Sequence, residues 1–104
     1  MSIEYLKKKR ILLVDDEPKL LDMVVSILKE NGFEYIYTAQ KVEEAVVVAE
    51  EYLPELAILD VMLPDGDGFS LMKRLRKKGN YPILFLTARG EDEDKLDGLG
   101  LGAD

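Results

Sequence analysis

Short apolar segments alternate with amphipathic segments along the chain. Apolar runs lie at 11–14, 56–59 and 83–86, and each has the length of a strand. Because these runs lack alternating polar positions, we expect strands buried on both faces, as in parallel sheets. A fourth strand is expected at 35–39, where mixed polarity suits the edge of a sheet.

The amphipathic segments between the strands have the spacing of helices. Three predicted helices begin at Pro18, Val42 and Asp67 and end at Asn31-Gly32, Tyr52 and Lys78. Their apolar positions are Leu20, Val24, Ile27 and Leu28 in the first, Val42, Ala45, Val46 and Ala49 in the second, and Phe69, Met72 and Leu75 in the third. A weaker fourth helix is expected at 91–99. Strands that alternate with helices predict a parallel sheet with helices on both faces.

Polar side chains directly follow the buried strands. Asp15 and Asp16 come after the first strand, Asp60 ends the third, and the hydroxyl of Thr87 follows the fourth. In an open parallel sheet, ligands bind outside the carboxyl ends of the strands. Clustered carboxylates repel one another near a core, and a hard cation with oxygen ligands relieves that repulsion. The sequence therefore predicts a magnesium site at this edge.

The stretch Asp15-Asp16-Glu17 also permits a simpler interpretation, in which its acids cap the helix that follows. For this stretch alone, both interpretations stay open. Asp60 favours the metal site, because it ends a buried strand and no helix starts directly behind it.

Composition narrows the class of protein. The chain has 104 residues, which suits one domain, and its net charge of −7 disfavours nucleic acid as a direct partner. It has no cysteine, which excludes disulfides and thiolate metal sites, and no histidine, so any phosphohistidine must come from a partner. No apolar run approaches the roughly 20 residues of a membrane span. The first ten residues do not form a signal peptide, and we expect a cytoplasmic protein.

Four motifs together resemble a known family. Asp15-Asp16, "ILDVMLPDGDG", "LFLTAR" and "GLGLGAD" follow one another in the order seen in receiver domains of two-component response regulators. The resemblance runs from about residue 10 to the last residue and is greatest to receivers of the OmpR/PhoB type, which carry a winged-helix DNA-binding domain downstream. It implies a flavodoxin-like, three-layer αβα fold with a parallel sheet of strand order 2-1-3-4.

The resemblance also assigns roles to residues at the strand ends. Asp60 would be the phosphoacceptor that takes a phosphoryl group from a sensor histidine kinase. Asp16, Asp60 and the backbone carbonyl of Met62 would bind Mg²⁺, and Asp15 would hold a metal-bound water. Such a domain is not an enzyme in the usual sense, although it assists its own phosphorylation and dephosphorylation.

Two further positions would contact the phosphoryl group. The Thr87 hydroxyl would bind a phosphoryl oxygen and act as a switch. Ala88 is small and leaves its backbone N–H open to the phosphoryl group, which the backbone of Met62 would also contact.

Three competing interpretations are disfavoured. Residues 65–68, "DGDG", do not continue as a calcium loop, because Phe69 and Arg76 occupy positions that need acidic ligands, and Pro64-Asp65-Gly66 suits a turn. A haloacid-dehalogenase-type phosphatase needs an aspartate where Met62 stands. The basic segment 73–78 suits a helix C-terminus better than a nucleic-acid surface.

The chain departs from the family at its end. A full receiver has a fifth strand, with a lysine and an aromatic switch residue, and a fifth helix, and we do not assign the lysine's role to Lys95. We therefore expect a single receiver domain over residues 1–104, truncated at its C-terminus. The strand at 83–86 would be an exposed edge, and an apolar strip on the first helix would be bare. An alternative is a self-associating structural fragment, a homodimer through this strand edge without signalling activity.

Overall fold

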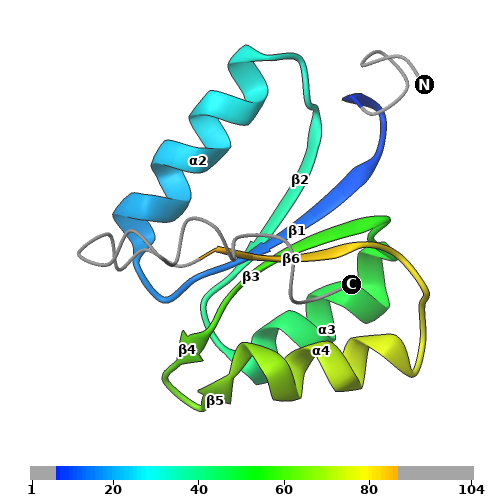
Figure 1. The fold of residues 1–104 in the computed structure, drawn as a ribbon. Coiled ribbons are helices and arrows are strands. Elements are labelled where there is room, and N and C mark those ends of the chain that lie inside the picture. Colours follow the sequence, from blue (N-terminus) through cyan, green and yellow to red (C-terminus); the bar gives the residue numbers. More distant parts are fainter. Residues whose placement is uncertain (1–6, 87–104) are drawn as a thin grey trace.

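A parallel sheet forms the centre of the fold in the computed structural model, which describes residues 7–86 (Figure 1). Its strands are β1 (Arg10–Val14), β2 (Tyr35–Ala39), β3 (Leu56–Asp60) and β6 (Ile83–Leu86), in the order β2-β1-β3-β6. The helices are α2 (Pro18–Glu30), α3 (Val42–Tyr52) and α4 (Gly68–Arg76). Because β6 is the fourth strand of this sheet along the chain, the order is the expected 2-1-3-4. The strand that was expected at an edge of the sheet is β2, and it lies at one edge.

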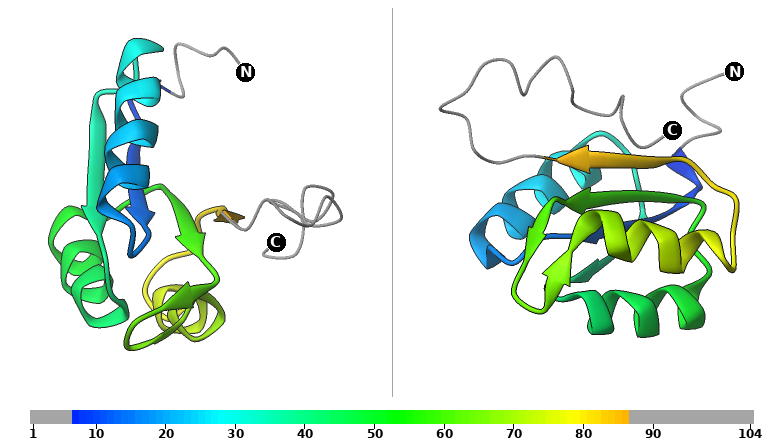
Figure 2. Two further views of the ribbon diagram at one scale, coloured as in Figure 1. Left: turned by 90° about the vertical axis from the view of Figure 1, so that its left-hand side faces the viewer. Right: turned by 60° about the horizontal axis from the view of Figure 1, so that its bottom comes forward.

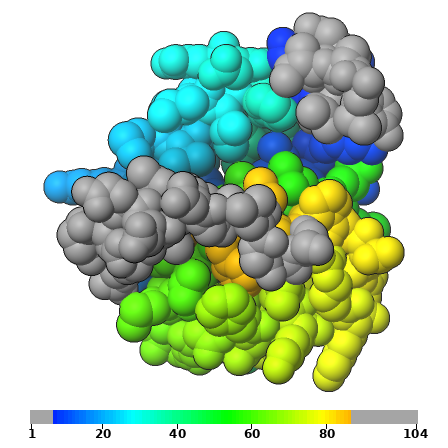
Figure 3. Space-filling view, in the orientation of Figure 1, coloured from blue at the N-terminus to red at the C-terminus, as the bar shows by residue number. Residues whose placement is uncertain are grey.

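The helices form outer layers on both faces of the sheet. α2 covers one face, and α3 and α4 cover the other (Figure 2). In the space-filling view, α2 and α4 accordingly lie on opposite sides of the molecule (Figure 3). This arrangement confirms the three-layer αβα fold. The predicted helix at 91–99 lies outside the described residues.

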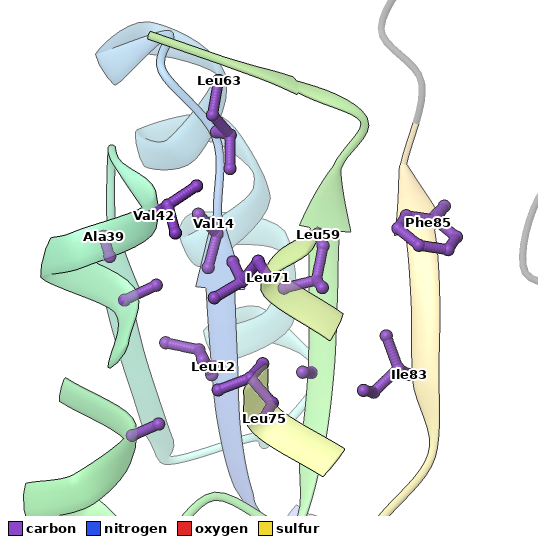
Figure 4. Packing of buried hydrophobic residues seen from close by; sticks show 13 residues of the cluster. Leu12, Val14, Ala39, Val42, Leu59, Leu63, Leu71, Leu75, Ile83 and Phe85 are labelled. Carbon is purple, nitrogen blue, oxygen red and sulfur yellow. The ribbon is translucent and has the colours of Figure 1, made fainter. Parts of the chain in front are cut away.

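Burial on both faces was predicted for the three apolar runs, and it is confirmed for β1 alone. In β3 and β6, buried residues alternate with half-buried ones. The half-buried residues lie on the face of the sheet that α2 alone covers among the described helices. In β1, Leu12 and Val14 point toward α3 and α4 and belong to the main apolar cluster (Figure 4). Ile11 and Leu13 are also buried but do not belong to this cluster, because successive side chains of a strand point to opposite faces.

The inward face of α4 differs from the prediction. Phe69 was expected to be buried, but it is 48% exposed, with its ring centroid 4.6 Å from that of Phe85. Leu71, which was not predicted, is fully buried at 0% exposure. The predicted Leu75 is buried as well. The helix begins at Gly68, which is buried against the sheet. Positions three and seven residues later, Leu71 and Leu75, share its face, and Phe69 is turned away from it.

The outward surface of α2 carries apolar side chains. Leu21 is its buried residue, whereas Met23 and Ile27 are about half exposed. The sequence predicted such a bare strip. None of the described helices is long and apolar enough to cross a membrane.

A short antiparallel ribbon follows β3 and was not predicted. Its strands are β4 (Met62–Leu63) and β5 (Gly66–Asp67), with Pro64 and Asp65 between them. The ribbon lies at the end of the molecule toward which β3 and β6 point (Figure 2). It therefore borders the edge of the sheet where the acidic residues were expected.

Candidate metal site at the carboxyl edge of the sheet

Three aspartates meet at the carboxyl edge of the sheet. The structure brings carboxylate oxygens of Asp15, Asp16 and Asp60 within 4.8 Å of one another. The strand register explains this, because β1 and β3 are parallel neighbours with Val14 opposite Leu59, so the residues after them lie side by side. The three predicted acidic ligands therefore form one cluster.

Asp15 is the buried member of the cluster. Its residue is only 1% exposed, and its Oδ1 accepts a hydrogen bond of 2.8 Å from the backbone N–H of Glu17. Its Oδ2 is buried and has no hydrogen-bond partner among the described residues. A buried carboxylate oxygen without a partner is costly, and a bound cation or water would satisfy it.

The electrostatics of Asp15 agree with its position. Burial raises the pKa of its carboxyl from an ordinary 3.8 to about 6. The hydrogen bond from Glu17 lowers this pKa, and the negative charges of Asp60, Asp16 and Glu17 raise it further. The carboxylates of the cluster therefore repel one another when they are ionised, and a divalent cation would relieve this repulsion. The oxygen donors of the cluster, with the unsatisfied Oδ2 of Asp15, fit Mg²⁺.

Helix capping does not account for these acids. Glu17 is the N-cap residue of α2, but no side chain makes a capping hydrogen bond there, and the first turn of α2 contains no acidic residue. Asp16 is exposed and belongs to the cluster. The structure therefore favours the metal interpretation that the sequence had left open for this stretch.

The chain turns after Asp60, and Gly68 packs against the backbone at this turn. The N–H of Gly68 donates a 2.7 Å hydrogen bond to the carbonyl of Val61. A Cβ at position 68 would lie 2.3 Å from the backbone oxygen of Asp60, so a larger residue does not fit without a shift of the backbone. This close packing restricts the backbone at Asp60 and Val61.

The acidic loop at 65–68 has a structural role. Asp65 accepts hydrogen bonds from the backbone N–H groups of Val42 and Glu43 at the start of α3, and Asp67 accepts one from Ser70 at the start of α4. Pro64 and Asp65 form the turn between the paired strands β4 and β5, so the turn interpretation is confirmed. The link to α3 could not be foreseen, because Asp65 and Val42 are 23 residues apart and no local pattern connects them.

The remaining predicted site residues have different outcomes. Met62 lies in the ribbon two positions after Asp60, with its side chain largely exposed. Thr87 and Ala88, and also Lys95, lie outside the described residues, so their roles stay predictions.

Comparison with known proteins agrees with the fold. Residues 11–104 match the family described as the response regulator receiver domain. Among curated proteins, the regulatory protein VanRc of Enterococcus gallinarum is 45% identical over 96 residues, which are 92% of this chain and 41% of that protein. The phosphate regulon transcriptional regulatory protein PhoB of Escherichia coli is 41% identical over 99 residues, with 92% of this chain and 43% of that protein covered. The chain thus spans less than half of each relative.

Solved structures show the same fold. The chemotaxis protein CheY4 of Vibrio cholerae superposes with a TM-score of 0.73 at 32% identity. The match covers 88% of this chain and 78% of that chain.

The raised pKa of Asp15 predicts how stability depends on pH without metal. Because its folded pKa of about 6 exceeds the ordinary 3.8, the native state binds more protons between these values, and stability falls as pH rises through them. At neutral pH the loss amounts to about 2–3 kcal/mol. Asp15→Asn should remove it and raise the free energy of unfolding by a similar amount at pH 7.

Urea unfolding of both proteins in chelator, from pH 4 to pH 7, measures this difference. Asparagine at position 15 keeps an oxygen for the Glu17 N–H, so it is a matched replacement. A difference between variant and wild type that does not grow with pH would contradict this interpretation of the burial of Asp15.

Proposed function

The chain belongs to the family of response regulator receiver domains, and from this premise we propose that Asp60 accepts a phosphoryl group from a sensor histidine kinase. The observation that carries the proposal is the position of Asp60. Its carboxylate ends β3 beside Asp16 and the buried, unsatisfied oxygen of Asp15. A nucleophile in such a cluster matches the demand of phosphoryl transfer for positioning and charge neutralisation.

In this proposal the aspartate cluster holds Mg²⁺. Asp16 and Asp60 would bind the ion directly, together with the backbone carbonyl of Met62. Asp15 would bind through a water molecule. When bound, Mg²⁺ neutralises negative charge on the carboxylates and on the phosphoryl oxygens.

The reaction requires little covalent chemistry from this chain. A carboxylate oxygen of Asp60 forms a bond to phosphorus while the bond from phosphorus to the partner's histidine nitrogen breaks, and the electron pair returns to that nitrogen. Thr87 and the backbone N–H groups of Met62 and Ala88 would contact phosphoryl oxygens. The domain would thus assist its own phosphorylation and later hydrolysis, without turning over a separate substrate.

The biological output is proposed from the relatives. VanRc and PhoB are named as regulatory proteins, and this chain spans 41% and 43% of their lengths. We propose that phosphorylation of this domain in the cytoplasm switches a downstream DNA-binding unit. The domain itself, with a net charge of −7, would not contact nucleic acid.

Acetyl phosphate tests the assignment of the phosphoacceptor. Incubated with acetyl phosphate and Mg²⁺, the wild-type chain should gain one phosphoryl group. Asp60→Asn should abolish the gain, and chelation of Mg²⁺ should suppress it. Mass spectrometry of the intact protein measures the product.

Asp67→Asn is the matched control for this experiment. Asp67 lies in the ribbon that follows Asp60, but its side chain caps α4. The Asp67→Asn protein should therefore be labelled like the wild type. Labelling of Asp60→Asn at the wild-type rate would refute the site.

A second candidate function is self-association through β6. Among the described residues, β6 pairs with β3 alone and forms one edge of the sheet. An apolar strand with an open edge can pair with a second copy. Sedimentation over a range of concentrations tests this: a dimer that dissociates on Leu84→Lys would support it, and a monomer at all concentrations would exclude it.

A further inference from the structure

The side chain of Asp65 connects the ribbon that follows Asp60 to the start of α3 by hydrogen bonds. Its Oδ1 accepts from the backbone N–H of Val42 at 2.7 Å, and its Oδ2 accepts from that of Glu43 at 3.1 Å. The helix α3 has no side-chain cap of its own, because its N-cap residue is Lys41. The hydrogen bond from Val42 is the main cause that lowers the pKa of Asp65, so the carboxylate is charged at neutral pH.

The ribbon also packs against α3 at a second point. A Cβ at Gly66 would lie 3.1 Å from Cγ2 of Val42, and Val42 is buried. Asp65 and Gly66 therefore anchor the tip of the ribbon at the start of α3. The base of the ribbon is anchored by Gly68 on the backbone of Asp60.

A ribbon of this size needs such anchors. Each of its strands has two residues, paired as Met62 with Asp67 and Leu63 with Gly66. Isolated hairpins are marginally stable even when they are longer, because they bury too little surface. The conformation of the ribbon therefore depends on the contacts at its tip and its base.

We propose that Asp65 is a positioning residue for the metal site, and this inference rests on the proposed function. A backbone carbonyl such as that of Met62 has no side chain that could reorient it, so its direction is set by the conformation of the ribbon. Asp65 connects the tip of the ribbon to α3 by two hydrogen bonds, and it thereby holds Met62 and the neighbouring Asp60 in the arrangement that Mg²⁺ requires. Residues that orient metal ligands commonly change metal affinity by tenfold or more when they are removed.

Mg²⁺ titrations of the wild type and of variants test the inference. Amide chemical shifts of the 15N-labelled protein give the dissociation constant for Mg²⁺ alone, without phosphorylation. Asp65→Ala should weaken binding about tenfold. Asp65→Asn keeps one acceptor for the Val42 N–H and should lose much less Mg²⁺ affinity than Asp65→Ala. Asp65→Ser, a milder change than alanine, should fall between them and gives a result even if Asp65→Ala does not fold.

Asp67→Ala separates positioning from stability. Asp67 caps α4 by a 2.7 Å hydrogen bond from Ser70, three residues away, so its loss weakens a helix cap without releasing the ribbon from α3. Urea unfolding should show a similar loss of stability for both alanine variants, whereas only Asp65→Ala should lose Mg²⁺ affinity.

Each outcome decides a different claim. Equal weakening of Mg²⁺ binding by Asp65→Ala and Asp67→Ala, or unchanged binding in Asp65→Ala, would overturn the positioning role alone. A wild-type protein whose spectrum does not respond to Mg²⁺ would overturn the proposed metal site, and the inference with it. Acetyl phosphate labelling of Asp60 in the wild-type protein tests the phosphoacceptor separately from the positioning role of Asp65.

Discussion

The repulsion among three carboxylates at one edge of the sheet is the constraint on which the rest of the site depends. Parallel pairing of β1 with β3 forces Asp15, Asp16 and Asp60 together, and burial of Asp15 leaves one of its oxygens unsatisfied. A fold without another need for these acids would be more stable with neutral residues there. The arrangement is explained if the cluster serves a cation. Burial first, and then the neighbouring negative charges, raise the pKa of Asp15, and a cation would favour its charged form.

Close contacts hold the backbone around the cluster in place. Gly68 brings the start of α4 against the carbonyl of Asp60, where no side chain fits, and it bonds to Val61. Asp65 extends this support to the start of α3. Elements on one face of the sheet thus hold the loop that follows the proposed phosphoacceptor, and the proposed phosphoryl transfer would rely on such preorganisation.

Local patterns in the sequence were sufficient for the four strands of the main sheet, the three described helices and the acidic cluster, but not for the ribbon of β4 and β5. The apolar runs located β1, β3 and β6, and the residues after the first two of these located the aspartates, because parallel strands end at a common edge. Contacts between distant segments were not predictable in this way. The burial of Leu71 in place of Phe69 follows from how Gly68 packs on the sheet, and the bond from Asp65 to α3 joins residues 23 positions apart. Such details depend on tertiary packing, which spacing along the chain does not encode.

The most direct test of the central claim is the free energy of unfolding as a function of Mg²⁺ concentration at pH 7. If the three aspartates form a cation site, Mg²⁺ binds the native state and should stabilise it in proportion to the logarithm of its concentration above the dissociation constant. That increase should be absent from Asp60→Asn, in which one ligand loses its charge. A wild-type protein that Mg²⁺ stabilises no more than an equal ionic strength of NaCl would contradict the account.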